Sequence, residues 1–388
     1  MFPEFKIEMT IFVVLQPIII QNIITMRRSV LILSAICALV FCSCKGNIND
    51  KGFEVVKVTT SDGVDYQLFA DPENGVGLAD AQGDILIRGQ FTNLQHIKRG
   101  TEGDCLIASI YTSVKYSEEE RKSTGYYIES RPVNLTGVYD FEGDEILPVE
   151  FGKVEAYPNN VFLATSTPAV SGKTVDMLFK GTECIATYDD IEVSDKGTAA
   201  LGISHHSQSG FSFRYFINPL TNQAYELGRT TSCVLGDNCV VFHNWGGDED
   251  YVMGLDGEIL LPVGVYDSVK LADGDYLICD TWNEGMAVFH VSDTVTPLLK
   301  SGKYEEYLKI PGAPGLFLFR EESPETRSKS WTFDWRYGLV DANGTVLIPT
   351  MYADAEIKSD IIKFRIPGTW KYDELSISML ASKHAIEK

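Results

Sequence analysis

Tryptophan and histidine side chains gather in or beside polar segments that interrupt the apolar runs of the chain. Aromatic rings on the exposed loops of a rigid scaffold can stack on sugars or fill pockets on a protein partner. We therefore interpret one set as a candidate binding rim for a glycan or protein: Trp245, Trp282, Trp331, Trp335, His205, His206 and His243. The alternative is that each tryptophan covers the core of its own sheet, and the sequence leaves both readings open.

The histidine and carboxylate clusters do not have the spacing of a metal site. His205 and His206 are adjacent, so on a strand they point to opposite faces, and no third ligand follows at a motif spacing. The acidic runs Asp248-Glu249-Asp250 and Asp189-Asp190 lack the alternating oxygen ligands of a dedicated calcium loop. We predict no metal and no cofactor.

Catalytic signatures are also missing. Gly202-Ile203-Ser204-His205 lacks the second glycine of a nucleophile elbow, and the sequence has neither a phosphate-cradling Gly-Lys loop nor a His-Glu-x-x-His motif. A carboxylate pair could still perform glycoside chemistry, but 54 acidic residues allow no such pair to be selected. The sequence favours a protein that is not an enzyme, with an exported polysaccharide-active enzyme as one alternative and a structural envelope component as another.

Length and charge restrict the partners. The 388 residues are 44% apolar, which suits one large all-β domain or a repeat array, and the net charge is −21. No basic stripe is available to neutralise phosphates, so nucleic acid is excluded as a partner.

The N-terminal region reads as an export signal. Met26-Arg27-Arg28 precedes an apolar run that ends at Ser43-Cys44. This is the pattern of a secretory signal, and the run is too short for a stable transmembrane helix. Its end resembles the lipobox of bacterial lipoproteins, which implies cleavage before Cys44 and acylation of Cys44, palmitate included. A plain secretory signal is the alternative.

The expected division of the chain follows from this signal. Residues 1–25 form an upstream extension that precedes the true start at Met26, 26–43 form the signal peptide, 44–52 form a polar tether, and 53–388 form one β-repeat domain. The expected location is the bacterial cell envelope, with a lipid anchor in the membrane.

Beyond the signal, a hairpin unit recurs. Tyr337-Gly338-Leu339-Val340-Asp341 is followed by Asn343-Gly344, a second apolar run, Pro349 and Tyr352; similar units cover 137–148 and 253–262. In these units a glycine precedes a proline by five positions. Asn-Gly between apolar runs predicts a two-residue type I′ turn, in which both residues have positive φ.

The hairpin units extend to seven four-stranded units, with centres near Gly83, Gly143, Gly181, Asn222, Gly257, Asp293 and Gly344. Each unit is read as two strands, the turn, a third strand, and a fourth strand after the proline, as in Tyr266–Leu271. Apolar residues occupy consecutive positions, so both faces of each sheet must be covered by neighbouring units. The arrangement predicts an all-β stack, most simply a seven- or eight-bladed β-propeller.

Closure of the propeller would come from the two ends of the domain. Phe53 to Val58 reads as an isolated fourth strand, and 361–366 with 370–377 reads as a first and second strand. Together they would complete a last blade and remove the exposed sheet edges. An open β-repeat array is the alternative.

The repeated unit consists of an aromatic residue, Gly-Leu-Val-Asp, a glycine, a β run, Ile-Pro and Tyr. This pattern is similar to that of the WG-repeat family of bacterial β-repeat proteins, with Tyr337 in place of the usual tryptophan. The match covers about half of the chain, and the family implies an architecture rather than an activity. The connections between the first and second predicted strands of each unit would fall on one side of such a fold. The candidate rim lies in or beside them, as does the acidic insertion at 112–124.

Five cysteines follow Cys44. An odd count at scattered positions does not form a disulfide framework. We predict buried thiols at Cys105, Cys184, Cys239 and Cys279, and identify Cys233 and Cys239 as the one pair to test.

Overall fold

The computed structural model describes residues 47–99, 103–124, 129–169, 172–205, 212–228, 232–243, 250–262, 264–273, 275–281, 285–291, 295–300, 306–323 and 335–386. These residues form eight antiparallel sheets in chain order, seven with four strands and the last with three. We number them sheet 1 to sheet 8. The all-β prediction with repeated four-stranded antiparallel sheets is confirmed.

The strands of the first four sheets are as follows. Sheet 1 comprises β1 (Glu54–Thr59), β2 (Asp65–Asp71), β3 (Gly75–Asp80) and β4 (Ile85–Phe91). Sheet 2 comprises β5 (Asn93–Ile97), β6 (Cys105–Lys115), β7 (Ser130–Tyr139) and β8 (Glu145–Phe151). Sheet 3 comprises β9 (Lys153–Tyr157), β10 (Val161–Thr165), β11 (Asp176–Lys180) and β12 (Glu183–Tyr188). Sheet 4 comprises β13 (Asp190–Val193), β14 (Ala200–His205), β15 (Ser212–Asn218) and β16 (Gln223–Gly228).

The remaining sheets continue the same order. Sheet 5 comprises β17 (Ser232–Leu235), β18 (Cys239–His243), β19 (Tyr251–Gly254) and β20 (Ile259–Leu261). Sheet 6 comprises β21 (Ser268–Ala272), β22 (Tyr276–Thr281), β23 (Gly285–Val291) and β24 (Val295–Lys300). Sheet 7 comprises β25 (Glu306–Lys309), β26 (Leu316–Glu322), β27 (Trp335–Asp341) and β28 (Val346–Tyr352). Sheet 8 comprises β29 (Asp354–Lys358), β30 (Ile361–Arg365) and β31 (Tyr372–Ser376).

The predicted strand grouping is displaced by one strand. The segment 266–271, predicted as a fourth strand, corresponds to β21, the first strand of the following sheet. In four places a single residue separates a fourth strand from the next first strand: Thr92, Gly152, Asp189 and Ala353. One residue cannot reverse the chain into an antiparallel hairpin, so the backbone passes on to the next sheet. The polar segments predicted between first and second strands therefore join the second and third strands.

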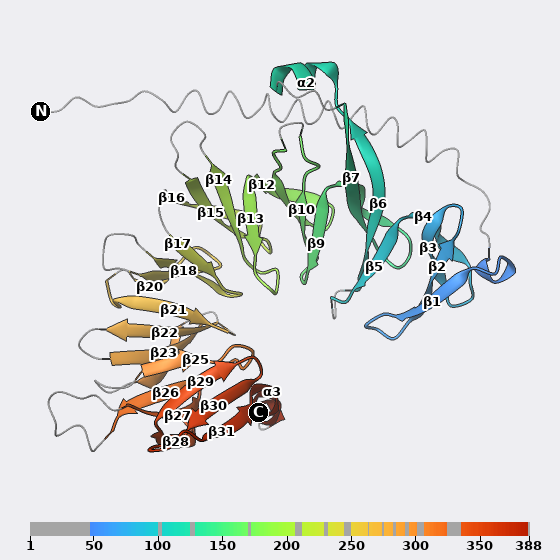
Figure 1. Cartoon of the computed structure of the whole chain (residues 1–388). Helices are drawn as coiled ribbons and strands as arrows, with labels where there is room; N and C mark the ends of the chain where they lie inside the picture. Colours follow the sequence, from blue (N-terminus) through green and yellow to red (C-terminus); the bar gives the residue numbers. More distant parts are fainter. Residues whose placement is uncertain are drawn as a thin grey trace, which may run out of the picture.

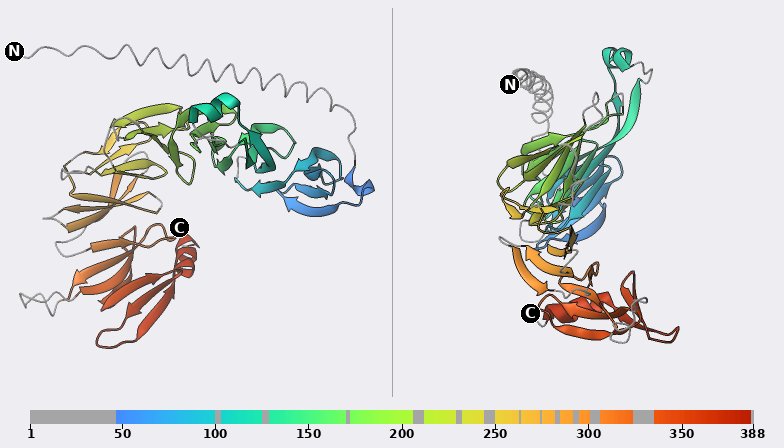
Figure 2. Two further views of the ribbon diagram at one scale, coloured as in Figure 1. Left: turned by 45° about the horizontal axis from the view of Figure 1, so that its top comes forward. Right: turned by 90° about the vertical axis from the view of Figure 1, so that its left-hand side faces the viewer.

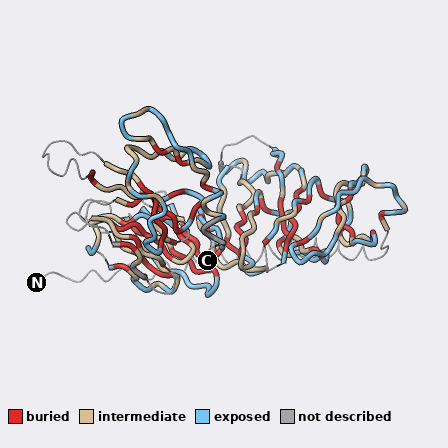
Figure 3. The backbone as a smooth tube through the Cα atoms, turned by 90° about the horizontal axis from the view of Figure 1, so that it is seen from below, coloured by how far each residue is buried: buried red, intermediate tan, exposed pale blue. Residues whose placement is uncertain are grey.

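Each successive pair of sheets shares an apolar cluster. Leu277 belongs to the cluster between sheets 5 and 6, whereas its neighbour Ile278 belongs to the cluster between sheets 6 and 7. Adjacent strand residues point to opposite faces, so the consecutive apolar residues are covered on both sides, as predicted. Figure 3 shows buried positions recurring through the strands of the stack and exposed positions concentrated at the turns.

The recurring glycine of the third strand has a steric reason. A Cβ atom on Gly338 would lie 2.5 Å from the carbonyl oxygen of Ile348, just before Pro349, and a Cβ on Gly137 would lie 2.6 Å from that of Leu147. The strand register shifts at both places. The fourth strand bulges toward the third ahead of its proline, and a residue without a side chain is needed opposite the bulge.

The turn after this glycine differs from the predicted type I′ turn. Gly344 has a φ of 83°, but Asn343 is not among the residues with positive φ. The backbone N–H of Asp341 donates to the Thr345 carbonyl at 3.0 Å, so three residues form the loop. The Asp341 carboxylate accepts from the backbone N–H groups of Asn343 and Thr345, at 2.9 and 2.7 Å. The loop therefore needs only one residue with positive φ, Gly344, because the Asp341 carboxylate accepts hydrogen bonds from the loop amides.

The stack is an open arc, and closure is not formed (Figures 1 and 2). β1 pairs with β2 and belongs to a complete sheet 1 instead of completing the last blade. The segments 361–366 and 370–377 correspond to the second and third strands of sheet 8, behind β29. The open β-repeat array therefore describes the molecule, with propeller-like sheets that do not meet at the ends.

Both ends carry a cap. Before β1, the 3-10 helix η1 (Ile48–Asp50) covers the outer face of sheet 1, and Ile48 is buried there. After β31, helix α3 (Ile377–Ile386) begins at the last residue of the predicted strand 370–377, and Ile377 packs into the cluster of sheets 7 and 8. In the described part of the chain, a second α-helix, α2 (Glu118–Thr124), lies between β6 and β7 in the acidic insertion. Among the described residues, no helix has the length and apolar character needed to cross a bilayer.

Candidate functional site

The antiparallel order places the ends of the sheets on two sides of the arc. The ends at which first strands lead into second strands face the concave side, whereas the opposite ends of the second strands face the convex side, where α2 also lies (Figure 1). The concave side carries a ladder of polar contacts that joins successive turns. Of the predicted rim, His205, His243 and Trp335 are described, and each lies at an end of its strand that faces the convex side.

Two buried aspartates hold the concave turns together. Asp104, the residue before β6, accepts from the Ser61 backbone N–H at 2.9 Å and from its hydroxyl at 2.7 Å, which joins sheet 2 to sheet 1. The same carboxylate contacts His96 Nε2 at 2.6 Å. Burial alone would raise the pKa of Asp104, but the hydrogen bonds from Ser61, His96 and Arg99 outweigh it and lower the pKa below its usual value.

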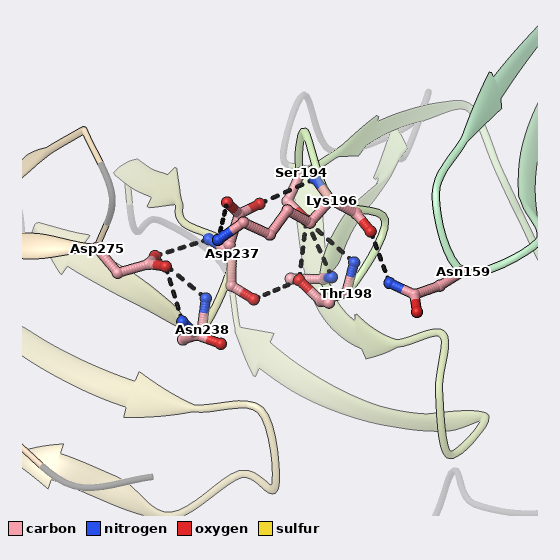
Figure 4. Close-up of polar contacts among 8 residues, drawn as sticks. Asn159, Ser194, Lys196, Thr198, Asp237, Asn238 and Asp275 are labelled. Carbon is pink, nitrogen blue, oxygen red and sulfur yellow. Dashed lines mark hydrogen bonds and ion pairs between the residues drawn. The ribbon is translucent and has the colours of Figure 1, made fainter. Parts of the chain in front are cut away.

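Asp275, the residue before β22, has the equivalent role in sheet 6. It accepts from the backbone N–H groups of Asp237 and Asn238, at 2.8 and 3.1 Å, and from Asn238 Nδ2 at 2.8 Å (Figure 4). The side chain is buried, with 3% of the residue exposed, and φ is +59°. Burial, the largest effect, raises the pKa of Asp275 despite these donors.

Between these two aspartates, further contacts continue the ladder across sheets 3, 4 and 5. Asn159 Nδ2 donates to the Lys196 carbonyl at 2.8 Å. Lys196 in turn pairs with Asp237, with Nζ 3.2 Å from the carboxylate and the backbone N–H donating to it at 3.0 Å (Figure 4). The Thr198 hydroxyl donates to the Asp237 carbonyl. The concave turns of sheets 3, 4, 5 and 6 are thus joined in succession by hydrogen bonds between side chains and backbone.

A cavity of about 400 Å³ opens beside this part of the ladder. Its ionisable lining comprises Glu192, Asp195, Asp237, Asp273, Asp275 and Lys309. The negative potential of such a cavity favours cationic groups. Within the described part of the chain, no group of three or more His, Cys, Asp or Glu side chains is arranged to hold a metal ion.

On the convex side, the two described rim histidines form local contacts. His205 Nδ1 lies 2.7 Å from the Ser212 hydroxyl across the β14–β15 pair, and its backbone N–H donates to Asp189 at 2.6 Å. Asp189 therefore does not orient the imidazole, so the serine, histidine and aspartate do not form a catalytic triad. His243 Nδ1 lies 3.0 Å from Asp250, whose carboxylate also accepts from the Val269 backbone in sheet 6.

The described tryptophans differ from each other. Trp335 begins β27 and is half-buried, with the Arg320 guanidinium 4.7 Å from the centre of its ring. This position fits a ring that covers its own sheet, the alternative stated for each tryptophan. Trp370, in the connection between β30 and β31, is 88% exposed. Trp245, Trp282, Trp331, His206 and Cys44 lie outside the described residues.

The five cysteines in the described part of the chain form no disulfide. Cys233 and Cys239 do not form a disulfide with each other, and the register places Cys233 opposite Phe242 instead of Cys239. Cys105, Cys239 and Cys279 are fully buried as predicted, whereas Cys184 is half-buried. Burial raises the pKa of Cys105 to about 11 and that of Cys279 to about 12.

The sequence interpretation did not identify the concave ladder. Its members are single aspartates, asparagines and threonines in turns, which resemble ordinary turn residues. One signal was present: Asp104 and Asp275 each stand directly before an apolar second strand. The displaced strand grouping concealed this shared position.

No protein-family model matches the chain, and neither does any curated protein sequence. Among solved structures, the chain is similar to a eukaryotic initiation factor, with 9% identity, 83% of this chain and 78% of that chain covered, and a TM-score of 0.35. It is also similar to the β-propeller domain of the trilobed protease from Pyrococcus furiosus, with 8% identity, 74% and 96% covered, and a TM-score of 0.28. A third similar structure, an oligogalacturonate lyase, has 11% identity, 61% and 95% covered, and a TM-score of 0.26. At this identity the likeness concerns the fold alone.

Proposed function

We propose that the chain is an exported, membrane-anchored and non-catalytic lipoprotein of the bacterial envelope that binds or scaffolds a partner, a glycan or a protein, through the convex edge of the arc. The observation that supports the proposal is that the second strands end, and the third strands begin, on the same convex side in successive sheets. The concave ladder makes the turns rigid, so loops at the opposite ends of the same strands are free to vary without loss of the scaffold. Curved repeat arrays offer long binding surfaces of this kind.

The acidic insertion supports a role for this edge. β6 and β7 pair as far as Lys115 and Ser130, so they extend beyond the neighbouring sheets and carry α2 outward (Figure 2). Ser117 and Glu120 form a capping box, with the Ser117 N–H donating to the Glu120 carboxylate at 2.8 Å. α2 is short, capped and exposed at the end of a long hairpin, a position suited to contact with a partner rather than to packing against the sheets.

Aromatic exposure favours the same edge. Trp370 has 88% of its surface accessible and contributes little to the core. Exposed tryptophan is a common anchor for sugars and protein partners. We therefore add Trp370 to the proposed rim, together with Trp245 and Trp282, and assign Trp335 to the scaffold.

The carboxylate cavity is the feature that would favour an enzyme. Its buried member, Asp275, directs its oxygens at three N–H donors of the neighbouring turn. A general acid must point at a substrate, and this carboxylate is already engaged in the scaffold. We therefore prefer binding to polysaccharide cleavage. A structural envelope component without a small ligand is the further alternative.

We also propose that the chain is a divergent WG-repeat protein. Support comes from the glycine of the repeated unit, because Gly137 and Gly338 are opposed by the same fourth-strand bulge. In sheet 5 the matching position is Tyr251, whereas Gly254 lies three residues later, at the end of β19. This divergence is consistent with a pattern that covers about half of the units.

The anchor is tested by fractionation of cells that express the full chain or the Cys44→Ala variant. The expected result is that the full chain is acylated and membrane-bound, whereas the variant is soluble and not acylated. Acylation that persists in the variant would contradict the anchor. The binding edge is tested by replacing 116–129 with a tight turn between Lys115 and Ser130, which should reduce partner capture and leave the unfolding transition unchanged.

A further inference from the structure

The segment before β1 is fixed to the outer face of sheet 1. Ile48 is 2% exposed, and its N–H donates to the Gly83 carbonyl at 2.9 Å. Asn47 and Asn49 each donate a side-chain N–H to the Gln82 carbonyl, at 3.1 and 3.0 Å. The chain is therefore part of the folded domain from Asn47 onward, although 44–52 was predicted as a tether.

Two residues, Lys45 and Gly46, separate Asn47 from Cys44. The Cα atoms of residues 44 and 47 can therefore be at most about 11 Å apart. A lipid on Cys44 would be buried in the bilayer with its sulfur at the headgroup boundary. A link this short cannot hold the domain far from the membrane, in contrast to the polar tether that was predicted over 44–52.

We propose that the outer face of sheet 1 is the membrane-facing surface of the protein and lies against the lipid headgroups. The proposal rests on the proposed acylation of Cys44. The bilayer is the occupant of that face, because the short link between the lipid on Cys44 and Asn47 leaves no room for another protein between sheet 1 and the headgroups. The arc then extends away from the membrane from its first sheet.

The two terminal faces of the stack differ in a way that fits this orientation. On the outer face of sheet 1, Phe53 stacks on Phe69 with ring centres 5.3 Å apart, and Val55 beside them is 41% exposed. The Lys51 ammonium lies 5.6 Å from the centre of the Phe53 ring. Apolar side chains beside a lysine suit the headgroup region.

Sheet 8 presents the opposite character at the other end of the stack. Lys363 pairs with Glu374 at 2.6 Å and Lys358 with Glu356 at 2.9 Å, both between exposed or half-buried side chains. Such paired charges are typical of a capping repeat that faces water.

The orientation is tested with a spin label on the lipidated full chain in phosphatidylethanolamine vesicles that contain a lipid with a nickel-chelating headgroup. Cys184 and Cys233, the two half-buried thiols, are first replaced by serine. One variant then carries the label at Val55→Cys, and the matched control carries it at Lys358→Cys on sheet 8. Nickel relaxes nearby spins, so we expect relaxation enhancement at position 55 to be at least threefold greater than at position 358.

A second variant distinguishes orientation from anchoring. A Gly-Ser insert of about 12 residues between Gly46 and Asn47, with an r.m.s. length of about 20 Å, should keep the protein on the vesicles and remove the difference between the labels. Equal relaxation at positions 55 and 358 in the vesicle-bound original chain would overturn the orientation and leave the anchor intact. Failure of the original chain to remain on the vesicles would overturn both. Circular dichroism of each labelled variant excludes loss of the fold as the cause.

Discussion

The carboxylate of Asp275 accepts two hydrogen bonds from Asn238, one from the backbone N–H at 3.1 Å and one from the side-chain Nδ2 at 2.8 Å. This relationship joins sheet 6 to sheet 5 at the concave side, where Asp104 joins sheet 2 to sheet 1. An open array has no closing contacts between its ends, so its curvature depends on contacts between neighbours.

Replacing Asp275 by alanine should lower the free energy of unfolding by about 2–4 kcal/mol, because the part-buried N–H groups of Asp237 and Asn238 lose their acceptor. Asp275→Asn keeps one acceptor oxygen and tolerates the positive φ, so its loss should be smaller. Urea unfolding measures both changes. Glu258→Ala, at an exposed position, is the control and should have little effect; an equal loss in the control would argue against a specific clamp.

The two clamps should differ in their pH dependence. Because the pKa of Asp104 is lowered on folding, its stabilisation is present above about pH 4, the ordinary carboxyl value, and is lost as the pH falls through the lower folded pKa. Because the pKa of Asp275 is raised, stability decreases as the pH rises from about 4 through the folded pKa.

Urea titrations between pH 3 and 7 should therefore show opposite trends in two variants. The stability advantage of the original chain over Asp104→Asn should shrink on acidification, and its advantage over Asp275→Asn should grow. Parallel trends in both variants would show that the two carboxylates titrate in the same way, contrary to the structure.

Gly338→Ala should destabilise the protein by about 3 kcal/mol, as expected for strong overpacking. The added methyl would meet the Ile348 carbonyl at 2.5 Å and the Phe319 ring at 2.8 Å. Val346→Ala in the same sheet removes a side chain that is 52% exposed, so it should change the melting temperature little. A neutral Gly338→Ala would mean that the fourth strand can move away from the third.

Native thiols should react with an aromatic disulfide reagent in two classes. Cys184 and Cys233 are half-buried and should react first, whereas Cys105, Cys239 and Cys279 are fully buried and should react on unfolding. Burial raises the pKa of Cys233 as well as those of the three buried thiols, so access of the reagent decides the order. Mass spectrometry of the non-reduced protein should show no bond between Cys233 and Cys239. Such a bond would contradict the register of β17 and β18.

Much of the fold follows from the sequence because strand and turn chemistry is local. Asp341, Gly344 and Pro349 mark a hairpin in which each residue meets a nearby requirement of the backbone. The grouping of strands does not follow, because a single residue such as Ala353 decides whether the chain turns back or moves on. Closure is also nonlocal, since it depends on small rotations between sheets that accumulate along the stack.

The candidate site was likewise predicted only in part. The sequence does not distinguish Trp335 from Trp370. In the structure, the Arg320 guanidinium lies over the ring of Trp335, whereas Trp370 is exposed. The concave ladder was missed because the sequence does not distinguish a buried aspartate such as Asp275 from a solvated one such as Asp256. Burial, which separates them, arises from the packing of neighbouring sheets.

The central claim is that the convex edge binds a partner and that the stacked sheets fold independently of the side chains that bind it. The most direct measurement is partner capture by the full chain and by a variant with Trp245, Trp282 and Trp370 replaced by alanine, using peptidoglycan sacculi and detergent-solubilised envelope proteins as probes. Melting temperatures are recorded for both, and Trp335→Ala serves as the scaffold control. The account predicts that the triple variant loses capture at an unchanged melting temperature, while Trp335→Ala melts earlier. Undiminished capture by a folded triple variant would contradict it.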